Sequence, residues 1–273
     1  MNPKEKYTKL LDSIATAQRP IVFINGCTHG DERVGLAVTQ VFADVVPEQG
    51  TLLTNIANEQ ALEKGVRYIN HDINRVGVGN EQGSYEEQLA FYLSAIAAQV
   101  DVFIDIHSTE SSLRDAVIVD HLDQQTQRLI DSVQPSVALV MRVTEGNVLL
   151  SSAKAGIAFE YGNDADPAAT QKIITDIKKI LHAQGMLTDT DAAVVSETGH
   201  APAVFIVEEE FPKDEGDQLD PQIANLQLVQ KGQTVYRNAA GEAVPAEYDF
   251  FPVLFSQNGY KNIFGFVGRR VEQ

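Results

Sequence analysis

Short apolar runs alternate with segments of helical spacing through residues 1–190 of the chain. Such runs, rich in Val, Ile and Phe, are typical of buried strands. They predict strands at Pro20–Gly26, Thr51–Asn58, Asp101–Ile106, Ala116–Val119, Val137–Val143 and Gly156–Glu160. Strands that alternate with helices are usually joined by crossovers and lie parallel. The pattern therefore predicts an α/β fold with a mixed, largely parallel sheet flanked by helices.

Two of the predicted helices have clear boundary signals. Asp166 is a typical N-cap residue, Pro167 suits the first helical position, and Gly185 is typical of the residue after a helix. Between them lies an apolar stripe of Ile173, Ile174, Ile177, Ile180 and Leu181. Ser84 and Glu87 have the spacing of a capping box, which predicts that a second helix begins there.

The pattern changes after residue 190. The segments AVFIVEEEF, LQLVQKGQTVYR and FFPVLF have strand character and are linked by turns that contain Gly. We therefore predict two domains, an α/β domain over residues 1–190 and a smaller β-rich domain over residues 191–273.

Composition and charge restrict the class of protein. Apolar residues make up 44% and charged residues 22% of the 273 residues, which is typical of a soluble globular protein. The net charge of −17 repels nucleic acid and anionic membrane surfaces, so neither is an expected partner. Because Cys27 is the single cysteine and no apolar segment resembles a secretion signal or a membrane span, we expect a cytoplasmic protein.

Three residues suggest a metal site. His29 and Glu32 follow the first predicted strand and are three residues apart, while His107 directly follows the strand DVFIDI. In an open parallel sheet, ligands bind beyond the carboxyl ends of the strands, so these side chains are expected to converge. Two histidines and a glutamate form a common zinc set that leaves a fourth position for water. For His107, a core histidine that donates to a main-chain carbonyl is the alternative.

Further polar groups follow the same strands. Glu160 ends the strand GIAFE, and a carboxylate beside a metal can accept a proton from water, although a loop or helix-capping role is equally consistent with its position. The segment RYINHDINR contains Arg67 and Arg75, whose planar guanidinium groups suit a substrate carboxylate. A surface network of these arginines with Asp72 is the alternative.

Four motifs in this order resemble the succinylglutamate desuccinylase and aspartoacylase family, a branch of the zinc carboxypeptidase superfamily. They are HGDE (His29–Glu32), RYINHDINR (Arg67–Arg75), DIHST (Asp105–Thr109) and FEYG (Phe159–Gly162). The resemblance covers roughly residues 21–162. It implies a zinc carboxypeptidase-like catalytic domain over residues 1–190, and a C-terminal domain that partly covers the active site.

The resemblance also implies an activity and residue roles. The activity is zinc-dependent removal of the acyl group from a small anionic N-acyl amino acid, with an acidic amino acid as the expected substrate. One Zn²⁺ per chain would bind His29, Glu32 and His107. Glu160 would be the catalytic base and Arg67 would polarise the scissile carbonyl. The remaining matches, to substrate-binding positions, are Asn74, Arg75 and, more weakly, Tyr260.

One position departs from the family pattern. Members that act on N-acetylaspartate carry an additional Arg about ten residues before the catalytic Glu, where it reads the side-chain carboxylate of the substrate. Leu150 occupies the nearest position here, which leaves Lys154 or Arg142 as possible replacements.

Two other functions use the same residues. A zinc carboxypeptidase acting on short peptides needs the same metal and the same clamp for an α-carboxylate. A non-catalytic zinc protein that binds a metabolite needs no base, so Glu160 argues against it. Self-association as a homodimer is expected only because symmetric dimers are common.

Overall fold

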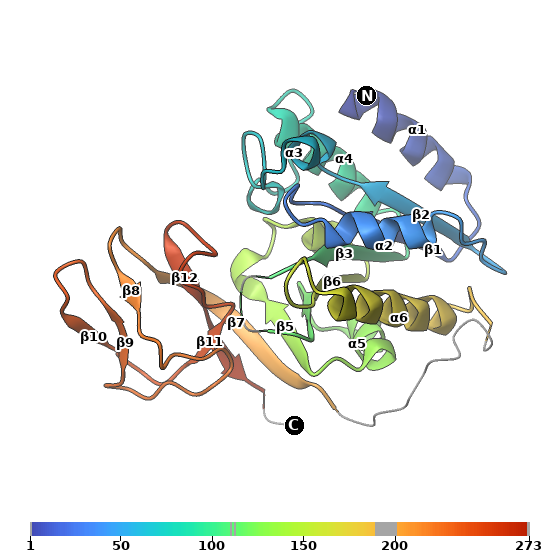
Figure 1. Ribbon diagram of the computed structural model, residues 1–273. Helices are drawn as coiled ribbons and strands as arrows, with labels where there is room; N and C mark the ends of the chain where they lie inside the picture. The colour runs from blue at the N-terminus through green and yellow to red at the C-terminus, as the bar shows by residue number, and fades with distance from the viewer. Residues whose placement is uncertain (1, 110, 112, 189–200, 272–273) are drawn as a thin grey trace.

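The computed structural model describes all residues except 1, 110, 112, 189–200 and 272–273. Its helices and strands follow one another as α1 (Pro3–Thr16), β1 (Ile21–Gly26), α2 (Val34–Phe42), β2 (Thr51–Ile56), α3 (Glu59–Lys64), η1 (Ile73–Arg75), α4 (Tyr85–Ala97), β3 (Val102–His107), β4 (Ala116–Val119), α5 (Gln124–Val133), β5 (Val137–Met141), η2 (Arg142–Thr144), η3 (Leu149–Ser152), β6 (Gly156–Glu160), α6 (Pro167–Ala183), β7 (Ala203–Pro212), β8 (Gln218–Leu219), β9 (Thr234–Arg237), β10 (Ala243–Pro245), β11 (Phe251–Val253) and β12 (Ile263–Arg270) (Figure 1).

In the described residues, the main sheet has nine strands in the order β11-β12-β7-β5-β4-β6-β3-β1-β2. Strands β2, β1, β3 and β6 are parallel neighbours, whereas β4 lies antiparallel to β6 and parallel to β5. A smaller antiparallel sheet contains β10, β9 and β8. The prediction of a mixed, largely parallel α/β sheet flanked by helices is confirmed.

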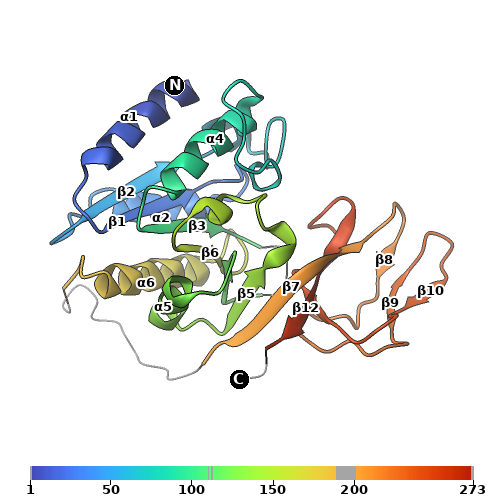
Figure 2. The same ribbon diagram turned by 180° about the vertical axis from the view of Figure 1, so that it is seen from behind.

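The six strands predicted in the first part of the chain are all present, and the direction of β4 is the feature that periodicity did not reveal. The predicted domain boundary between residues 190 and 191 lies outside the described residues. Beyond it, β7, β11 and β12 extend the main sheet, while β8, β9 and β10 form the small sheet to one side (Figure 2). Strand β12 had not been predicted, and the division into two domains stays a prediction.

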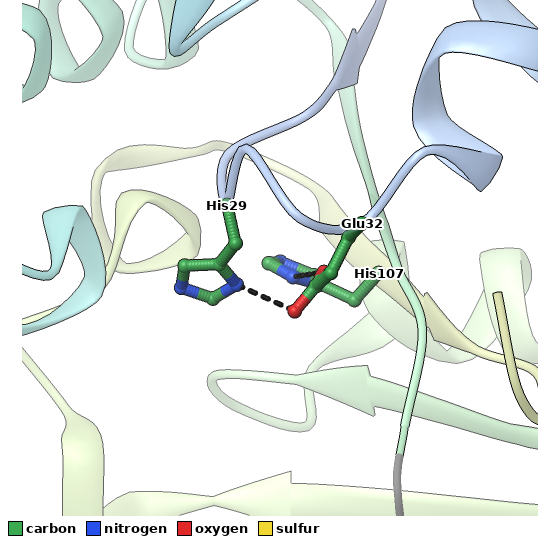
Figure 3. A group of neighbouring side chains, drawn as sticks. All are labelled: His29, Glu32 and His107. Carbon is green, nitrogen blue, oxygen red and sulfur yellow. Dashed lines mark hydrogen bonds and ion pairs between the residues drawn. The ribbon is translucent and has the colours of Figure 1, made fainter. Parts of the chain in front are cut away.

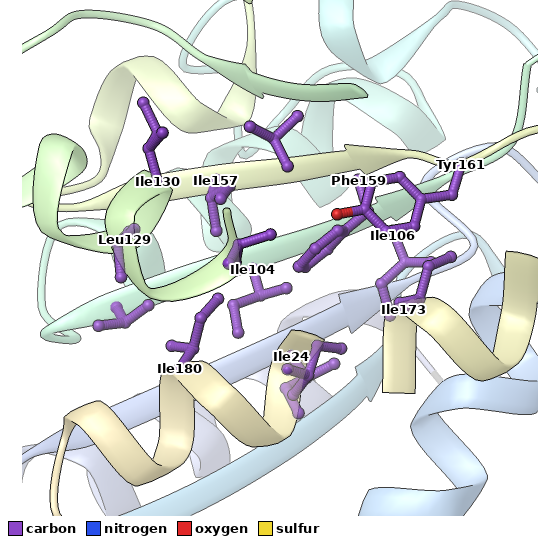
Figure 4. Close-up of a cluster of buried hydrophobic side chains, with 14 of the residues drawn as sticks. Ile24, Ile104, Ile106, Leu129, Ile130, Ile157, Phe159, Tyr161, Ile173 and Ile180 are labelled. Atoms are coloured by element: carbon purple, nitrogen blue, oxygen red, sulfur yellow. The ribbon is translucent and has the colours of Figure 1, made fainter. Parts of the chain in front are cut away.

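Helices cover both faces of the sheet. The apolar sides of α2, α5 and α6 pack against one face, where Ile24, Ile104, Ile106, Ile157 and Phe159 point outward from the strands (Figure 4). Helices α1 and α4 cover the opposite face over β1 and β3. Each fully buried aliphatic side chain contributes roughly 1.5–3 kcal/mol, so these two layers hold the strand ends in place. The described helices include none that is long and apolar enough to cross a membrane.

The two predicted helix starts are those of α4 and α6. Ser84 and Glu87 form the capping box of α4, in which the Ser84 amide and hydroxyl donate to the Glu87 carboxylate at 2.8 and 2.7 Å. The Asp166 carboxylate accepts from the Ala168 amide at 2.9 Å at the start of α6. These local hydrogen bonds satisfy amides that would otherwise lack partners.

Helix α2 approaches β1 at two glycines, which positions the turn between them. A Cβ atom on Gly35 would lie 2.5 Å from the Cys27 amide nitrogen, and one on Gly26 would lie 2.5 Å from the Gly35 carbonyl oxygen. Because both obstacles are backbone atoms, no side-chain rotation can make room. The close contact therefore fixes the turn of residues 27–33, which leads from the strand into the helix.

We expect Gly35→Ala to lower the free energy of unfolding by about 1–3 kcal/mol, because overpacking outweighs the roughly 1 kcal/mol that alanine gains in a helix. Urea denaturation followed by circular dichroism measures the change. Val41→Ala, at an exposed position of the same helix, is the control. An unchanged or higher midpoint for Gly35→Ala would show that α2 can move away from β1.

Candidate metal centre and active site

His29, Glu32 and His107 lie together at the carboxyl ends of β1 and β3 (Figure 3). His29 and Glu32 belong to the turn after β1, and His107 is the last residue of β3. One ligand atom from each lies within 4.8 Å of the others, and the three residues are only 4–7% exposed. The two imidazole ring centres are 5.0 Å apart.

Both imidazoles present the same ring nitrogen to the centre of this group. The Nδ1 atoms of His29 and His107 lie 2.8 and 2.9 Å from the two carboxylate oxygens of Glu32. One histidine therefore uses each oxygen of the carboxylate. The two Nδ1 atoms and the Glu32 carboxylate thus face one another and offer two nitrogen ligands and one carboxylate ligand.

The outer nitrogens are held by two further carboxylates. His29 Nε2 lies 3.1 Å from Asp72, and His107 Nε2 lies 2.9 Å from Asp105. Asp105 is itself held by the Asn25 amide and the Thr28 hydroxyl, which donate at 2.9 and 2.7 Å. Carboxylates in this position orient metal-binding imidazoles and increase their basicity. The sequence analysis considered Asp72 only as part of a surface network with the arginines, whereas here it contacts His29.

Neighbouring charges shift the pKa values of His29, Glu32 and His107. Burial acts to lower the pKa of His29 and of His107, but the neighbouring carboxylates outweigh it and raise both. Burial likewise acts to raise the pKa of Glu32, while the two histidines hold it well below its usual range. A divalent cation at the centre would satisfy the same donors without protonated imidazoles. Two imidazole nitrogens and a carboxylate are a donor set that suits zinc.

Glu160 lies beside this group on the neighbouring strand. In the parallel pairing of β3 with β6, His107 is opposite Glu160, so their side chains lie on the same face of the sheet. Burial is the main cause that raises the pKa of Glu160 to about 7, with the nearby Glu32 carboxylate adding to it and His107 opposing it. A carboxyl group with this pKa is suited to accept and return a proton near neutral pH.

The segment RYINHDINR places its recognition groups around the same site. Arg67 pairs with Glu32 at 3.1 Å and with Asp72 at 3.3 Å. Asn74 and Arg75 line the cavity beside it, and the Asn74 side-chain oxygen accepts from the Leu149 amide at 3.2 Å. Part of the suggested network with Asp72 is thus present, but it reaches Glu32 and, through Asp72, His29, so it is not confined to the surface.

A cavity of about 260 Å³ opens over the site. All the predicted site residues line it, namely His29, Glu32, Arg67, Asn74, Arg75, His107, Glu160 and Tyr260. Tyr260 comes from the C-terminal part of the chain together with Leu254 and Phe266. Burial raises the pKa of the Tyr260 hydroxyl, and Glu160 adds to the shift, so this tyrosine is a neutral hydrogen-bonding group.

Leu150 lines the cavity at the position where some family members carry the additional Arg. Neither suggested replacement lies among the described lining residues. Lys154 is exposed, and Arg142 is exposed and pairs with Glu208 at 3.3 Å. Burial also raises the pKa of the Cys27 thiol to about 12, which makes this cysteine unsuited to act as a nucleophile.

Comparisons with known proteins point to one family. Residues 18–180, more than half of the chain, match the family described as succinylglutamate desuccinylase/aspartoacylase catalytic domain. The chain is 23% identical to a probable aspartoacylase of Nostoc sp., over 88% of this chain and 92% of that protein. It is 22% identical to an N-acyl-aromatic-L-amino acid amidohydrolase (carboxylate-forming) of Xenopus tropicalis, over 88% of each chain.

The fold is also shared with solved structures. The crystal structure of murine aminoacylase 3 superposes with a TM-score of 0.73 at 18% sequence identity, covering 92% of this chain and 95% of that one. A succinylglutamate desuccinylase/aspartoacylase from Rhodobacter sphaeroides gives a TM-score of 0.69 at 17% identity, covering 93% and 86% of the two chains. Together with the match over residues 18–180, these similarities show that this chain belongs to the succinylglutamate desuccinylase/aspartoacylase family.

Proposed function

We propose that this protein is a zinc-dependent amidohydrolase that removes the acyl group from N-acyl amino acids. The observation that carries the proposal is the arrangement of His29, Glu32 and His107 around one point, with Glu160 on the adjacent strand. The family and the names of the relatives support amide hydrolysis of acylated amino acids. A donor set with an orienting carboxylate behind each histidine supports zinc as the metal.

A zinc ion held by these three residues supplies a Lewis acid that lowers the pKa of water to about 7. The chain's own residues then perform the proton transfers. Glu160 accepts a proton from the attacking water as the oxygen bonds to the amide carbon, and returns it to the nitrogen as the C–N bond breaks. The products are a carboxylic acid and a free amino acid, so atoms and protons balance.

Arg67, Asn74 and Arg75 are the residues proposed to bind the substrate. Arg67 is proposed to stabilise negative charge on the carbonyl oxygen, because it pairs with Glu32 beside the group formed by His29, Glu32 and His107. Asn74 and Arg75 are proposed to bind the α-carboxylate, since an arginine fork matches a carboxylate with two hydrogen bonds. The proposal does not include an acidic side chain on the substrate, because Leu150 offers no charge at the position that would read one.

A hydrolysis panel tests the proposed function. Zinc-loaded protein is given N-acetyl, N-formyl and N-succinyl amino acids, matching derivatives whose α-carboxylate is amidated, and dipeptides. We expect release of free amino acid from acylated substrates with a free α-carboxylate, and little from the amidated ones. Faster cleavage of dipeptides would favour a peptidase, and binding without any hydrolysis would favour a metabolite-binding protein.

The pH dependence of activity follows from Glu160. Only its ionised form can accept a proton, and its pKa is raised to about 7, so activity is expected to fall as the pH drops below neutrality. Bound zinc adds positive charge near this carboxylate and moves the acid limb toward lower pH. Values of kcat/KM across the acid range measure the limb. A rate that stays constant far below neutral pH would contradict Glu160 as the base.

A further inference from the structure

The cavity that contains His29, Glu32, His107 and Glu160 is also lined by another buried carboxylate, Asp120. In the antiparallel pairing of β4 with β6, Ala116 lies opposite Glu160 and Ile118 lies opposite Ala158. Side chains two and four residues apart along a strand share a face, and Asp120 directly follows β4. Asp120 therefore lies about 13 Å along the strand from the level of Glu160. It lines the cavity and is only 6% exposed.

Apolar side chains line part of the cavity that contains these two carboxyl groups. The described residues that line it include Ile118, Met141, Leu150, Ala158 and Phe266. The arginines of the lining lie at the other end, where Arg67 and Arg75 both influence the pKa of Tyr260. Among the described lining residues, no lysine or arginine forms an ion pair with Asp120.

Few polar groups contact the buried carboxylate of Asp120. The Ser151 hydroxyl donates to one oxygen at 2.8 Å, and the half-exposed His121 lies 3.8 Å from the other. Burial raises the pKa of this carboxyl group, and Glu145 adds to the rise while Ser151 and His121 oppose it. A buried carboxylate in this state favours a cationic partner and disfavours a second negative charge.

Three consecutive residues connect Asp120 to the proposed α-carboxylate clamp. The Leu149 amide donates to Asn74, the Leu150 side chain lines the cavity, and the Ser151 hydroxyl donates to Asp120. An amino acid whose α-carboxylate binds at Asn74 would extend its side chain past Leu150 toward Asp120. A substrate side chain with an aliphatic part and a charged end would match Leu150 and then Asp120.

We propose that the cavity selects N-acyl amino acids with a long aliphatic side chain that ends in a cation, with Asp120 as the specificity-determining residue. The inference rests on the proposed deacylase function and names its substrate class. Lysine, with a four-carbon stem and an ammonium group, has this chemistry. An aspartate side chain would instead bring a carboxylate toward Leu150 and Asp120, where it would be desolvated without a partner.

The test compares N-acetyl-L-lysine, N-acetyl-L-norleucine and N-acetyl-L-aspartate as substrates of the zinc-loaded protein. Norleucine has the stem of lysine without the ammonium group, so their ratio isolates the charge. We expect kcat/KM for the lysine derivative to exceed that for norleucine by at least about tenfold. Asp120→Asn, in which the amide oxygen can still accept from Ser151, should lower the lysine value about 10- to 100-fold and change the norleucine value little.

Glu145→Gln is the matched control, because Glu145 is an exposed acid that influences Asp120 but does not line the cavity. Glu145→Gln should leave the preference for lysine over norleucine intact. A loss of preference equal to that of Asp120→Asn would mean that the overall negative charge of the region, and not contact with Asp120, selects the cation. Preference for N-acetyl-aspartate, or equal rates for lysine and norleucine, would overturn the inference while leaving the deacylase function in place. Hydrolysis of other acylated amino acids but of none of these three would also overturn the inference alone. Failure of the zinc-loaded protein on every acylated amino acid of the hydrolysis panel would contradict the proposed function, and this inference with it.

Discussion

Replacing Glu160 by glutamine is expected to lower kcat by about 10²- to 10⁴-fold while leaving metal binding unchanged. The amide has nearly the same size as the carboxyl group but cannot accept a proton from water. Glu160 lies beside His29, Glu32 and His107 without belonging to the proposed ligand set, so these three residues should keep their positions. Single-turnover kinetics and elemental analysis of the same preparation measure the two quantities together.

Glu63→Gln provides the control for this substitution, since Glu63 is an exposed glutamate of α3 away from the cavity. It should have the activity and metal content of the unmodified protein. Turnover by Glu160→Gln at close to the original rate would remove Glu160 from the mechanism. Loss of metal from that variant would instead make Glu160 part of the binding group.

Replacing His107 by alanine is expected to abolish metal binding, and with it activity, by at least about 10³-fold. The substitution removes one of three donors and also the partner of two buried carboxylates, Glu32 and Asp105. Their mutual repulsion should lower the free energy of unfolding as well, because buried charges that lose a partner are destabilising. Elemental analysis after dialysis against trace zinc measures the metal, and urea denaturation measures the stability.

His71→Ala separates a specific effect from a general one. His71 belongs to the motif RYINHDINR, yet it is exposed and does not line the cavity. This variant should retain about one zinc per chain. His107→Asn, which retains a polar side chain, provides a second variant in case the alanine variant does not fold. Full zinc occupancy in a folded variant at position 107 would contradict the proposed ligand set.

Much of the fold and of the site was predictable because the signals are local. Apolar runs marked the six strands of the first part of the chain, and capping residues such as Ser84 and Asp166 marked two helix starts. His29, His107 and Glu160 were recognisable because each lies at or just beyond the end of an apolar run. The carboxyl ends of parallel strands share one edge of a sheet, so position along the chain was enough to predict their proximity.

Strand direction was decided only by tertiary structure. The run Ala116–Val119 has the same composition whether it lies parallel or antiparallel to its neighbour, and in the structure β4 is antiparallel to β6. That reversal carries Asp120 along the sheet face into the cavity, away from the edge where the metal group lies. Periodicity reports which face of a strand is buried, but not which strand lies beside it.

Long-range hydrogen bonds likewise could not be predicted from the sequence. Nothing in the spacing of RYINHDINR distinguishes a surface carboxylate from one that holds an imidazole, but folding places Asp72 3.1 Å from His29. Strand β12 and Tyr260 reach the site because the C-terminal strands pair with the main sheet. The amino acid sequence by itself determined which residues are proposed for metal binding and proton transfer. The tertiary structure decided what surrounds them, because contacts between distant segments depend on packing of the whole chain.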